Sequence, residues 1–115
     1  MTHVGSCHCG KISYEVDGEI DRVIECNCSH CSRKGYLLWF VPREQVRFRS
    51  GESELVTYLF NKRAIQHKFC PVCGVAPFGF GEHPPGTHMA AVNVRCLEGV
   101  ELGELEIMPV DGRSS

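Results

Sequence analysis

The sequence has no long apolar run and no marked excess of either charge. No stretch of eighteen apolar residues occurs in the 115-residue chain, so we expect no membrane-spanning helix. Residues 1–5 show neither the charged nor the apolar segment of a secretory signal, and we therefore expect a cytoplasmic protein. The net charge of −2, from 12 basic and 14 acidic residues, gives no general electrostatic reason to bind nucleic acid or an anionic membrane.

Linkers, internal repeats and low-complexity stretches are also missing from the sequence. A chain of this length can bury roughly two-thirds of the surface that it exposes when unfolded. Its hydrophobic share of 43% is ordinary for a globular protein. We therefore expect a single domain over residues 1–115 with a genuine apolar core.

Helical periodicity is scarce, whereas short segments with strand character are frequent. Residues 11–16 alternate apolar and polar side chains and end at the turn Asp17-Gly18, as a half-buried strand does. Residues 37–41 form a continuous apolar run that stops at Pro42. This run predicts a strand buried on both faces, with Trp39 and Phe40 in the core. Further strands are expected at residues 23–28, 46–49, 56–60, 64–69, 78–81 and 89–97, with 56–60 and 64–69 forming a hairpin around residues 61–63.

One short helix is expected at residues 29–34, with Ser29 as its N-cap. Many short strands between glycine and proline turns are typical of an antiparallel, mainly β domain. The predicted fold class is therefore mainly β with little helix.

Seven of the eight cysteines fall into three tight clusters along the chain. The clusters are Cys7-His8-Cys9, Cys26-Asn27-Cys28-Ser29-His30-Cys31 and Cys70-Pro71-Val72-Cys73. A Cys-x-x-Cys pair brackets a tight turn that directs two sulfurs to one point. A Cys-x-Cys pair places two sulfurs on the same face of an extended segment. Both spacings are typical of metal ligands.

Three other interpretations of the cysteines compete with zinc. A disulfide framework is typical of small secreted domains, which the start of the chain does not favour. A redox Cys-x-x-Cys pair is a second alternative. Iron also binds four thiolates, and the sequence separates it poorly from zinc. Paired Cys-x-x-Cys and Cys-x-Cys groups in a reducing compartment favour zinc.

Seven thiols in such groups divide naturally as four plus three. Four thiolates close a structural zinc site, whereas three leave one coordination position open for water or substrate. We therefore expect two zinc ions per chain, with any chemistry at the open site.

The three motifs together resemble one known family. Gly5-x-Cys7-x-Cys9-Gly10 precedes a strand that contains Tyr14, and Cys26-x-Cys28-Ser29-x-Cys31 and Phe69-Cys70-x-x-Cys73-Gly74 follow in order. This pattern, which covers residues 5–97, resembles the glutathione-dependent formaldehyde-activating enzyme family, also called the centromere protein V domain.

The resemblance implies a fold, two ligand sets and an activity. The implied fold is Mss4-like (a β-tent), in which antiparallel sheets surround zinc. A four-cysteine cluster, Cys7, Cys9, Cys70 and Cys73, is implied to hold the structural zinc. A three-cysteine cluster, Cys26, Cys28 and Cys31, is implied to hold the second, catalytic zinc. The implied activity is that of a carbon–sulfur lyase acting on a small-molecule thiol adduct such as S-hydroxymethylglutathione, formed from glutathione and formaldehyde.

A fourth thiolate on a three-thiolate zinc would give a centre of charge −2, which needs compensation. Arg33, Lys34 and Arg43 are the candidate cations, and they could also pair with the carboxylates of glutathione. The alternative interpretation is that each is a solvated surface charge.

Four further side chains have both a structural and a functional interpretation. Cys96 is expected as a buried small hydrophobe on the strand at residues 89–97, with fourth zinc ligand as its alternative. His30 is expected to point outward, with proton shuttle as the alternative role. His67 is expected in the core, with metal ligand as its alternative role, and His8 is expected at the surface, because of their places in strand alternation.

Two other function classes compete with a lyase. A non-catalytic binding module would have two structural zincs and would need a fourth protein ligand at the second site. Methionine-sulfoxide reductase chemistry would need a nucleophilic cysteine outside the zinc ligands, and Cys96 lacks a suitable setting. The sequence therefore favours the lyase over both.

Overall fold

Short strands make up most of the regular secondary structure. The computed structural model describes residues 1–59, 65–82 and 85–112. Its strands are β1 (Thr2–Ser6), β2 (Ser13–Asp17), β3 (Arg22–Cys26), β4 (Leu38–Pro42), β5 (Val46–Ser50), β6 (Val56–Tyr58), β7 (Gln66–Phe69), β8 (Phe78–Glu82), β9 (His88–Asn93) and β10 (Glu106–Val110). The described helices are α1 (Ser29–Lys34) and the 3-10 turns η1 (Arg43–Gln45), η2 (Glu52–Glu54), η3 (Val94–Cys96) and η4 (Leu102–Glu104). The prediction of a mainly β protein with little helix is confirmed.

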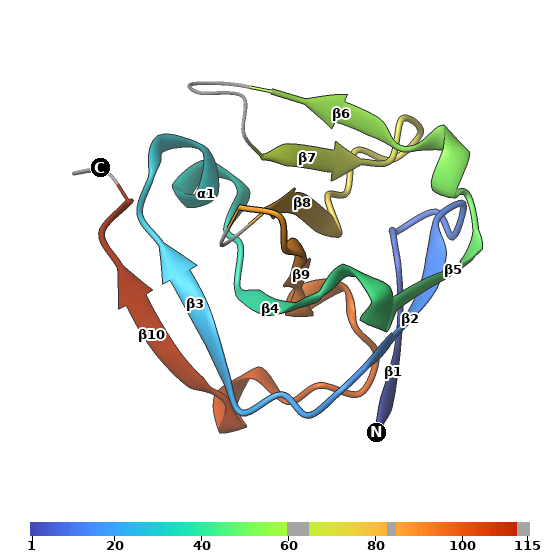
Figure 1. The fold of residues 1–115 in the computed structure, drawn as a ribbon. Coiled ribbons are helices and arrows are strands. Elements are labelled where there is room, and N and C mark those ends of the chain that lie inside the picture. The colour runs from blue at the N-terminus through green and yellow to red at the C-terminus, as the bar shows by residue number, and fades with distance from the viewer. Residues whose placement is uncertain (60–64, 83–84, 113–115) are drawn as a thin grey trace.

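The strands form two sheets that lie against each other (Figure 1). The smaller sheet has the order β1-β2-β5, and the larger has the order β10-β3-β4-β9-β8-β7-β6. Helix α1 connects β3 to β4 at one end of the larger sheet. Among the described residues, no helix combines the length and the apolar character that a bilayer crossing requires.

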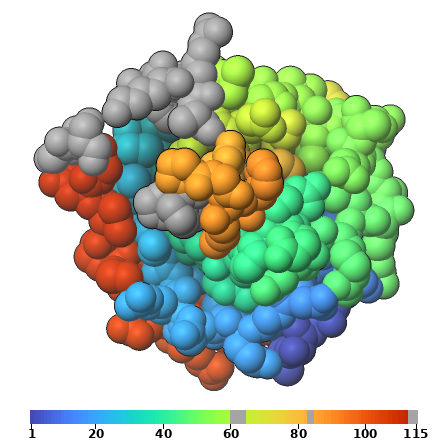
Figure 2. All heavy atoms as spheres, viewed as in Figure 1, coloured from blue at the N-terminus to red at the C-terminus, as the bar shows by residue number. Residues whose placement is uncertain are grey.

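The last strand departs from the antiparallel arrangement that the sequence predicts. β10 pairs parallel with β3, and Val110 lies opposite Cys26. The sequence does not predict β10, because Pro109 interrupts it and its side chains are mostly exposed. Proline is tolerated on an edge strand, and β10 forms the edge of the sheet, in red beside β3 in Figure 2.

Aromatic side chains join the two sheets at the centre of the core. The ring of Tyr14 on β2 lies 4.3 Å from that of Phe78 on β8, measured between centroids. Phe48 on β5 lies 5.5 Å from Phe78. Both Tyr14 and Phe78 are almost fully buried, and burying a large apolar side chain stabilises a fold by about 1.5–3 kcal/mol. The core therefore lies between the sheets.

β4 is buried on one face, and not on both as the sequence predicts. Trp39 and Val41 are buried, which confirms Trp39 as a core residue, whereas Phe40 is 48% exposed. The strand lies in a sheet with antiparallel neighbours whose second face is open to solvent, so its side chains alternate between core and surface. The prediction of Phe40 as a core residue is wrong for this reason.

The strand predicted at residues 89–97 ends early, at Asn93. The buried Asn93 side chain donates to the carbonyl of Ala76 (3.3 Å) and accepts from the N–H of Arg95 (3.2 Å). These two bonds turn the chain into η3. Cys96 therefore lies in a 3-10 turn and is half-buried, which corrects the prediction that it lies on a strand.

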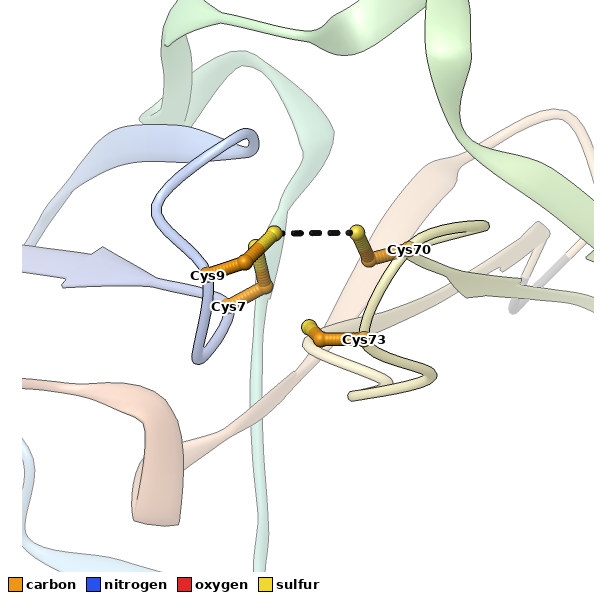
Figure 3. Close-up of side chains that lie close together, drawn as sticks. All are labelled: Cys7, Cys9, Cys70 and Cys73. Carbon is orange, nitrogen blue, oxygen red and sulfur yellow. Dashed lines mark hydrogen bonds between the residues drawn. The ribbon is translucent and has the colours of Figure 1, made fainter.

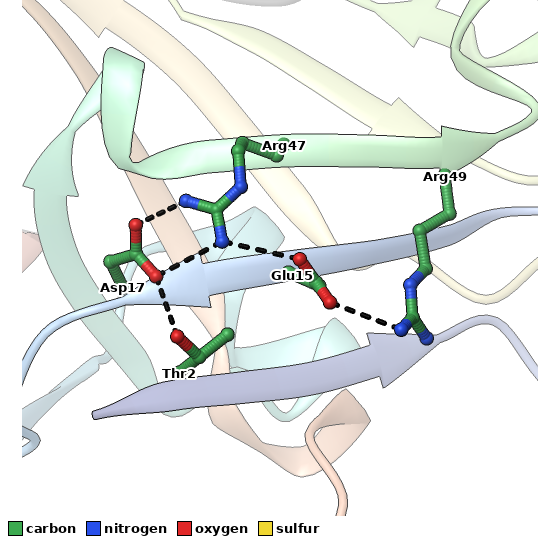
Figure 4. A network of polar contacts seen from close by, with 5 residues as sticks. All are labelled: Thr2, Glu15, Asp17, Arg47 and Arg49. Atoms are coloured by element: carbon green, nitrogen blue, oxygen red, sulfur yellow. Dashed lines mark hydrogen bonds and ion pairs between the residues drawn. The ribbon is translucent and has the colours of Figure 1, made fainter.

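A network of ion pairs covers the outer face of the smaller sheet (Figure 4). Arg47 on β5 pairs with Asp17 and with Glu15 on β2, and Arg49 pairs with Glu15 at 3.0 Å. The hydroxyl of Thr2 on β1 donates to Asp17 (2.8 Å). Cross-strand pairs of opposite charge stabilise a sheet by about 0.2–1 kcal/mol each. The network thus connects the three strands of the smaller sheet through their side chains.

The two strands of the hairpin predicted at residues 56–60 and 64–69 are present as β6 and β7. β6 and β7 pair antiparallel, with Val56 opposite Phe69. The predicted turn at residues 61–63 lies outside the described residues. β7 leads directly into Cys70.

Candidate metal centres and adjoining cavities

The four-cysteine cluster connects two distant loops (Figure 3). Cys7 and Cys9 lie in the loop after β1, and Cys70 and Cys73 lie in the loop after β7. The Sγ atoms of Cys7 and Cys9 are 3.6 Å apart, and those of Cys9 and Cys70 are 3.7 Å apart. All four sulfurs lie within 4.8 Å of one another. A tetrahedron of sulfurs about 2.3 Å from zinc has edges of about 3.8 Å, so this donor set fits zinc.

Backbone N–H groups already point at the sulfurs of this cluster. The N–H of Ile12 donates to Cys7 Sγ (3.3 Å). The pKa of Cys73 is lowered to about 6 because the N–H groups of Val75 and Cys9 donate to its sulfur. Such donors favour the thiolate, which is the form that binds metal. All eight cysteines are free thiols, as a metal site requires.

The three-cysteine cluster is built at the start of α1. Cys26 ends β3, Cys28 is the N-cap of α1, and Cys31 lies in the first turn of the helix. The three sulfurs lie within 4.8 Å of one another. The prediction of Ser29 as N-cap is wrong, because the Sγ of Cys28 accepts the N–H of Cys31 at 3.3 Å. The same extended backbone at Cys28 thus caps the helix and directs the sulfur toward its neighbours.

The protonation equilibria of this cluster are unequal. Burial works to raise the pKa of Cys28, but the N–H of Cys31 and the neighbouring thiols outweigh it, so the pKa is lowered. Burial raises the pKa of Cys31, and the charges at Cys28 and Cys26 act in the same direction. Among the described residues, no fourth cysteine, histidine or carboxylate joins the group. The cluster therefore offers three sulfur donors and leaves a fourth position for another ligand.

Cys96 is not part of either cluster. It lies outside both groups of sulfurs, and burial raises its pKa to about 11, with charge at Cys7 and Cys73 acting in the same direction. It therefore lies nearer the four-cysteine cluster, beside Tyr14.

A cavity of about 460 Å³ opens beside the three-cysteine cluster, and we call it the cysteine cavity. Its lining includes Cys26, Cys31, Tyr36, Arg95, Asn27 and Asp111. Tyr36 is 5% exposed, and none of the described residues is a hydrogen-bond partner of its hydroxyl. Burial raises the pKa of Tyr36 to about 12, and charge at Cys31, Cys96 and Cys28 also contributes. The hydroxyl therefore stays protonated at neutral pH close to the sulfurs.

A second cavity of about 610 Å³, the histidine cavity, lies on the other side of α1. The ring of His30 lies 4.3 Å from that of His67 and 5.5 Å from that of Tyr58. His30 thus packs against β6 and β7, which corrects the prediction that it points outward. His67 is half-buried, and burial together with positive charge at His30 and Lys34 lowers its pKa to about 4.

The three candidate cations for the three-cysteine cluster, Arg33, Lys34 and Arg43, do not lie together in the structure. Arg33 and Lys34 line the histidine cavity, across α1 from the cysteine cavity. Arg43 lies in neither, because it pairs with Glu52 at 3.1 Å and stacks 4.4 Å over the ring of Phe80. His8 is exposed, as predicted.

The sequence does not reveal two side chains that border the three-cysteine cluster. Arg95 lines the cysteine cavity and its Nε donates to the carbonyl of Gly35 at 3.0 Å. Tyr36 lines both cavities. Tyr36 stands close to the motif in sequence, but it lies just before the apolar run at residues 37–41 and belongs to no metal-ligand pattern. Arg95 is brought there by the turn at Asn93, which has no signal in the spacing of the cysteines.

Gly112, the second residue after β10, also borders the cluster. A Cβ atom at Gly112 would lie 2.5 Å from Cys26 Sγ and 3.1 Å from Cys28 Cβ. The chain is anchored there by the N–H of Asn27, which donates to Val110 (3.1 Å), and by the side chain of Asn27, which donates to Asp111 (3.0 Å). Glycine is needed at this position because the backbone passes so close to the sulfur.

Both the sequence and the fold of this chain are similar to those of known proteins. The model of the glutathione-dependent formaldehyde-activating enzyme family matches residues 2–109. A crystal structure of a Rhodobacter sphaeroides protein is similar to this one with a TM-score of 0.79 and 32% sequence identity. The similarity covers 94% of this chain and 100% of the other.

Proposed function

The chain belongs to the glutathione-dependent formaldehyde-activating enzyme family, and on that premise we propose that it is a zinc-dependent carbon–sulfur lyase. Its reaction is the reversible addition of a small thiol, such as glutathione, to formaldehyde. The observation that carries the proposal is the three-cysteine cluster, which has no fourth protein ligand among the described residues and borders the cysteine cavity.

In this proposal each of the two cysteine clusters binds one zinc ion. The four-cysteine cluster would hold a structural zinc, and the three-cysteine cluster would hold the catalytic one, because sulfur donors at these separations suit zinc. When bound at the second cluster, zinc supplies a Lewis acid that lowers the pKa of a thiol ligand and so favours its nucleophilic form. We propose that the whole activity belongs to one domain, residues 1–115.

The reaction balances without an oxidant or a reductant. The thiol loses its proton, its sulfur forms a bond to the carbonyl carbon, and the π electron pair moves to the oxygen, which takes up a proton. The reverse reaction breaks the same carbon–sulfur bond. Cys26 and Cys31 line the cavity, so a metal that they held would be within reach of a thiol that entered it. The N–H groups that donate to Cys26 and Cys28 hold those side chains in place during this exchange.

Cys28→Ser tests the proposal, because it removes one of the three sulfurs while the four-cysteine cluster stays intact. We expect metal content to fall from two zinc ions per chain to one, with a cooperative thermal transition retained. The rate of S-hydroxymethylglutathione formation and breakdown should fall to the uncatalysed rate. Metal analysis, calorimetry and exchange kinetics measure these three quantities on one preparation.

Cys96→Ala is the matched control, because Cys96 is a cysteine outside both clusters. It should keep two zinc ions and the wild-type rate. Equal rates for wild type and Cys28→Ser would contradict catalysis at the three-cysteine cluster. Loss of folding in Cys28→Ser would favour a second structural zinc and a binding module.

A further inference from the structure

Arg95 lines the cysteine cavity, and one nitrogen of its guanidinium group, Nε, makes a hydrogen bond there. Its Nε donates to the carbonyl of Gly35 at the end of α1 (3.0 Å). Across the described residues, no hydrogen bond or ion pair occupies Nη1 or Nη2 of this side chain. A guanidinium anchored in this way is pre-organised and keeps donors for a planar carboxylate.

Arg95 is the only Lys or Arg in the described lining of the cysteine cavity. The lining also contains the carboxylates of Glu25 and Asp111, and Asp111 accepts a hydrogen bond from Asn27 at 3.0 Å. Positive and negative groups in one cavity complement a ligand that carries both charges. A thiol built on an amino acid has a carboxylate and an ammonium group in addition to its sulfur.

Tyr36 supplies the second independent observation. Tyr36 is only 5% exposed, and its hydroxyl has no hydrogen-bond partner within the part of the chain that the structure describes. Tyr36 packs in one cluster with Cys31 and Ala76, against Cys26 and Cys28. A buried hydroxyl without a partner is unfavourable, and an acceptor oxygen placed beside it would satisfy it.

We propose that Arg95 binds the carboxylate of an amino-acid-based thiol in the cysteine cavity, and that the Tyr36 hydroxyl donates a hydrogen bond to the carbonyl oxygen of the aldehyde. This inference rests on the proposed function and assigns a role in thiol specificity to Arg95 and a role in the chemical step to Tyr36. Arg95 selects the thiol through its charge. Tyr36 stabilises the oxygen as it gains negative charge during formation of the carbon–sulfur bond.

The role of Arg95 can be tested by binding alone. Protein loaded with Co²⁺ is titrated with 3-mercaptopropionate and with 3-mercaptopropionamide, which differ in charge but not in chain length. The change in the sulfur-to-cobalt absorption band gives each Kd. We expect wild type to bind the carboxylate about 10-fold more tightly than the amide, and Arg95→Gln to bind both equally, with its affinity for the amide unchanged.

Arg33→Gln is the matched comparison, because Arg33 lies on the other side of α1 and lines the histidine cavity. It should keep the preference for the carboxylate. A preference that survives in Arg95→Gln, or that is lost in Arg33→Gln, would overturn the assignment. Equal binding of both thiols by wild type would overturn the assignment while leaving the proposed function standing. If neither thiol changed the spectrum, both would fail.

Tyr36→Phe separates the second role from packing, because it keeps the ring and removes only the hydroxyl. We expect kcat to fall about 100-fold, the effect typical of losing one donor to a developing oxyanion. The Kd of each thiol and the metal content should not change, and Tm should stay the same or rise, since an unpartnered hydroxyl is removed. Wild-type kcat in Tyr36→Phe would overturn the role of the hydroxyl.

Discussion

Single side chains near the clusters serve structure and chemistry at once. Cys28 ends the extended segment after β3, caps α1 and presents its sulfur to Cys31. His30, between Cys28 and Cys31, packs against His67 across the histidine cavity. Helix α1, which contains Cys31, is thus held at its N-terminus by the Cys28 cap and at its side by the contact between His30 and His67. A change in that pair should therefore alter stability near the metal site.

His67 should make the fold sensitive to acid. Its folded-state pKa is about 4, below the ordinary value of about 6.5, so the folded protein favours the neutral ring. The resulting stability is fully present above pH 6.5 and is lost as pH falls from 6.5 to 4. Because solvent screens this half-buried ring, we expect a loss of about 1 kcal/mol, well below the full linkage value.

His67→Gln should abolish that part of the acid sensitivity. Free energies of unfolding measured between pH 7 and pH 4.5 should fall less in the variant than in wild type. The thiols titrate in both proteins, so the difference isolates His67. His88→Gln, at an exposed position, should behave as wild type. Parallel pH profiles for His67→Gln and wild type would show that the ring contributes nothing.

The close approach of cysteines within one motif is predictable from sequence, because Cys-x-Cys and Cys-x-x-Cys spacings are local. The meeting of Cys7 and Cys9 with Cys70 and Cys73 is not local, and only the family resemblance implies it. Arg95 and Tyr36 are different, because a turn and a buried cluster place them. Their positions depend on tertiary packing, which no short pattern encodes.

At the scale of elements, β10 has a role beyond completing the sheet. Its parallel pairing with β3 extends to Val110, whose carbonyl accepts the N–H of Asn27. This brings Gly112 to the side of Cys26. The strand thereby forms one wall of the three-cysteine cluster.

Gly112→Ala should weaken metal binding at the three-cysteine cluster without unfolding the protein. The added Cβ would lie 2.5 Å from Cys26 Sγ, which is too close when the sulfur is fixed by a metal. We expect about a 10-fold loss of affinity for the second zinc, similar to the effect of disturbing groups that support a metal ligand. Competition with a chromophoric chelator measures it. Gly103→Ala, whose Cβ would meet nothing within 4 Å, should bind as wild type, and equal affinities in all three proteins would contradict this account.

Elements with a strong alternating pattern were predictable, and those without it were not. β2 and β5 bury every second side chain over part of their length and lie close to their predicted positions. β1 and β10 escape prediction, since β1 contains Gly5 and β10 contains Pro109. Gly5 is required because a Cβ there would lie 2.5 Å from the ring of Tyr14, a constraint that exists only in the folded state.

At the scale of the whole molecule, the two sheets meet at two places, the aromatic core and the four-cysteine cluster. Tyr14 and Phe78 join the two sheets through ring contact. The loops that carry Cys7 and Cys70 leave different sheets and meet at the cluster. A metal at this point would tie the start of the chain to its middle. Its loss should affect both sheets, unlike loss of the metal beside α1.

Cys70→Ser should therefore prevent folding, whereas Cys28→Ser should not. A structural zinc supplies roughly 10–16 kcal/mol in small peptides, against a total domain stability of about 5–15 kcal/mol. In wild type, a mild chelator should remove one zinc ion from the three-cysteine cluster first, with little change in circular dichroism. Removal of the second ion should coincide with loss of the β signal. Cys96→Ser, outside both clusters, should follow the wild-type course. A soluble Cys70→Ser protein with a cooperative thermal transition would contradict this prediction. It would show that the sheets stay together without a metal at the four-cysteine cluster, through packing such as that of Tyr14 against Phe78.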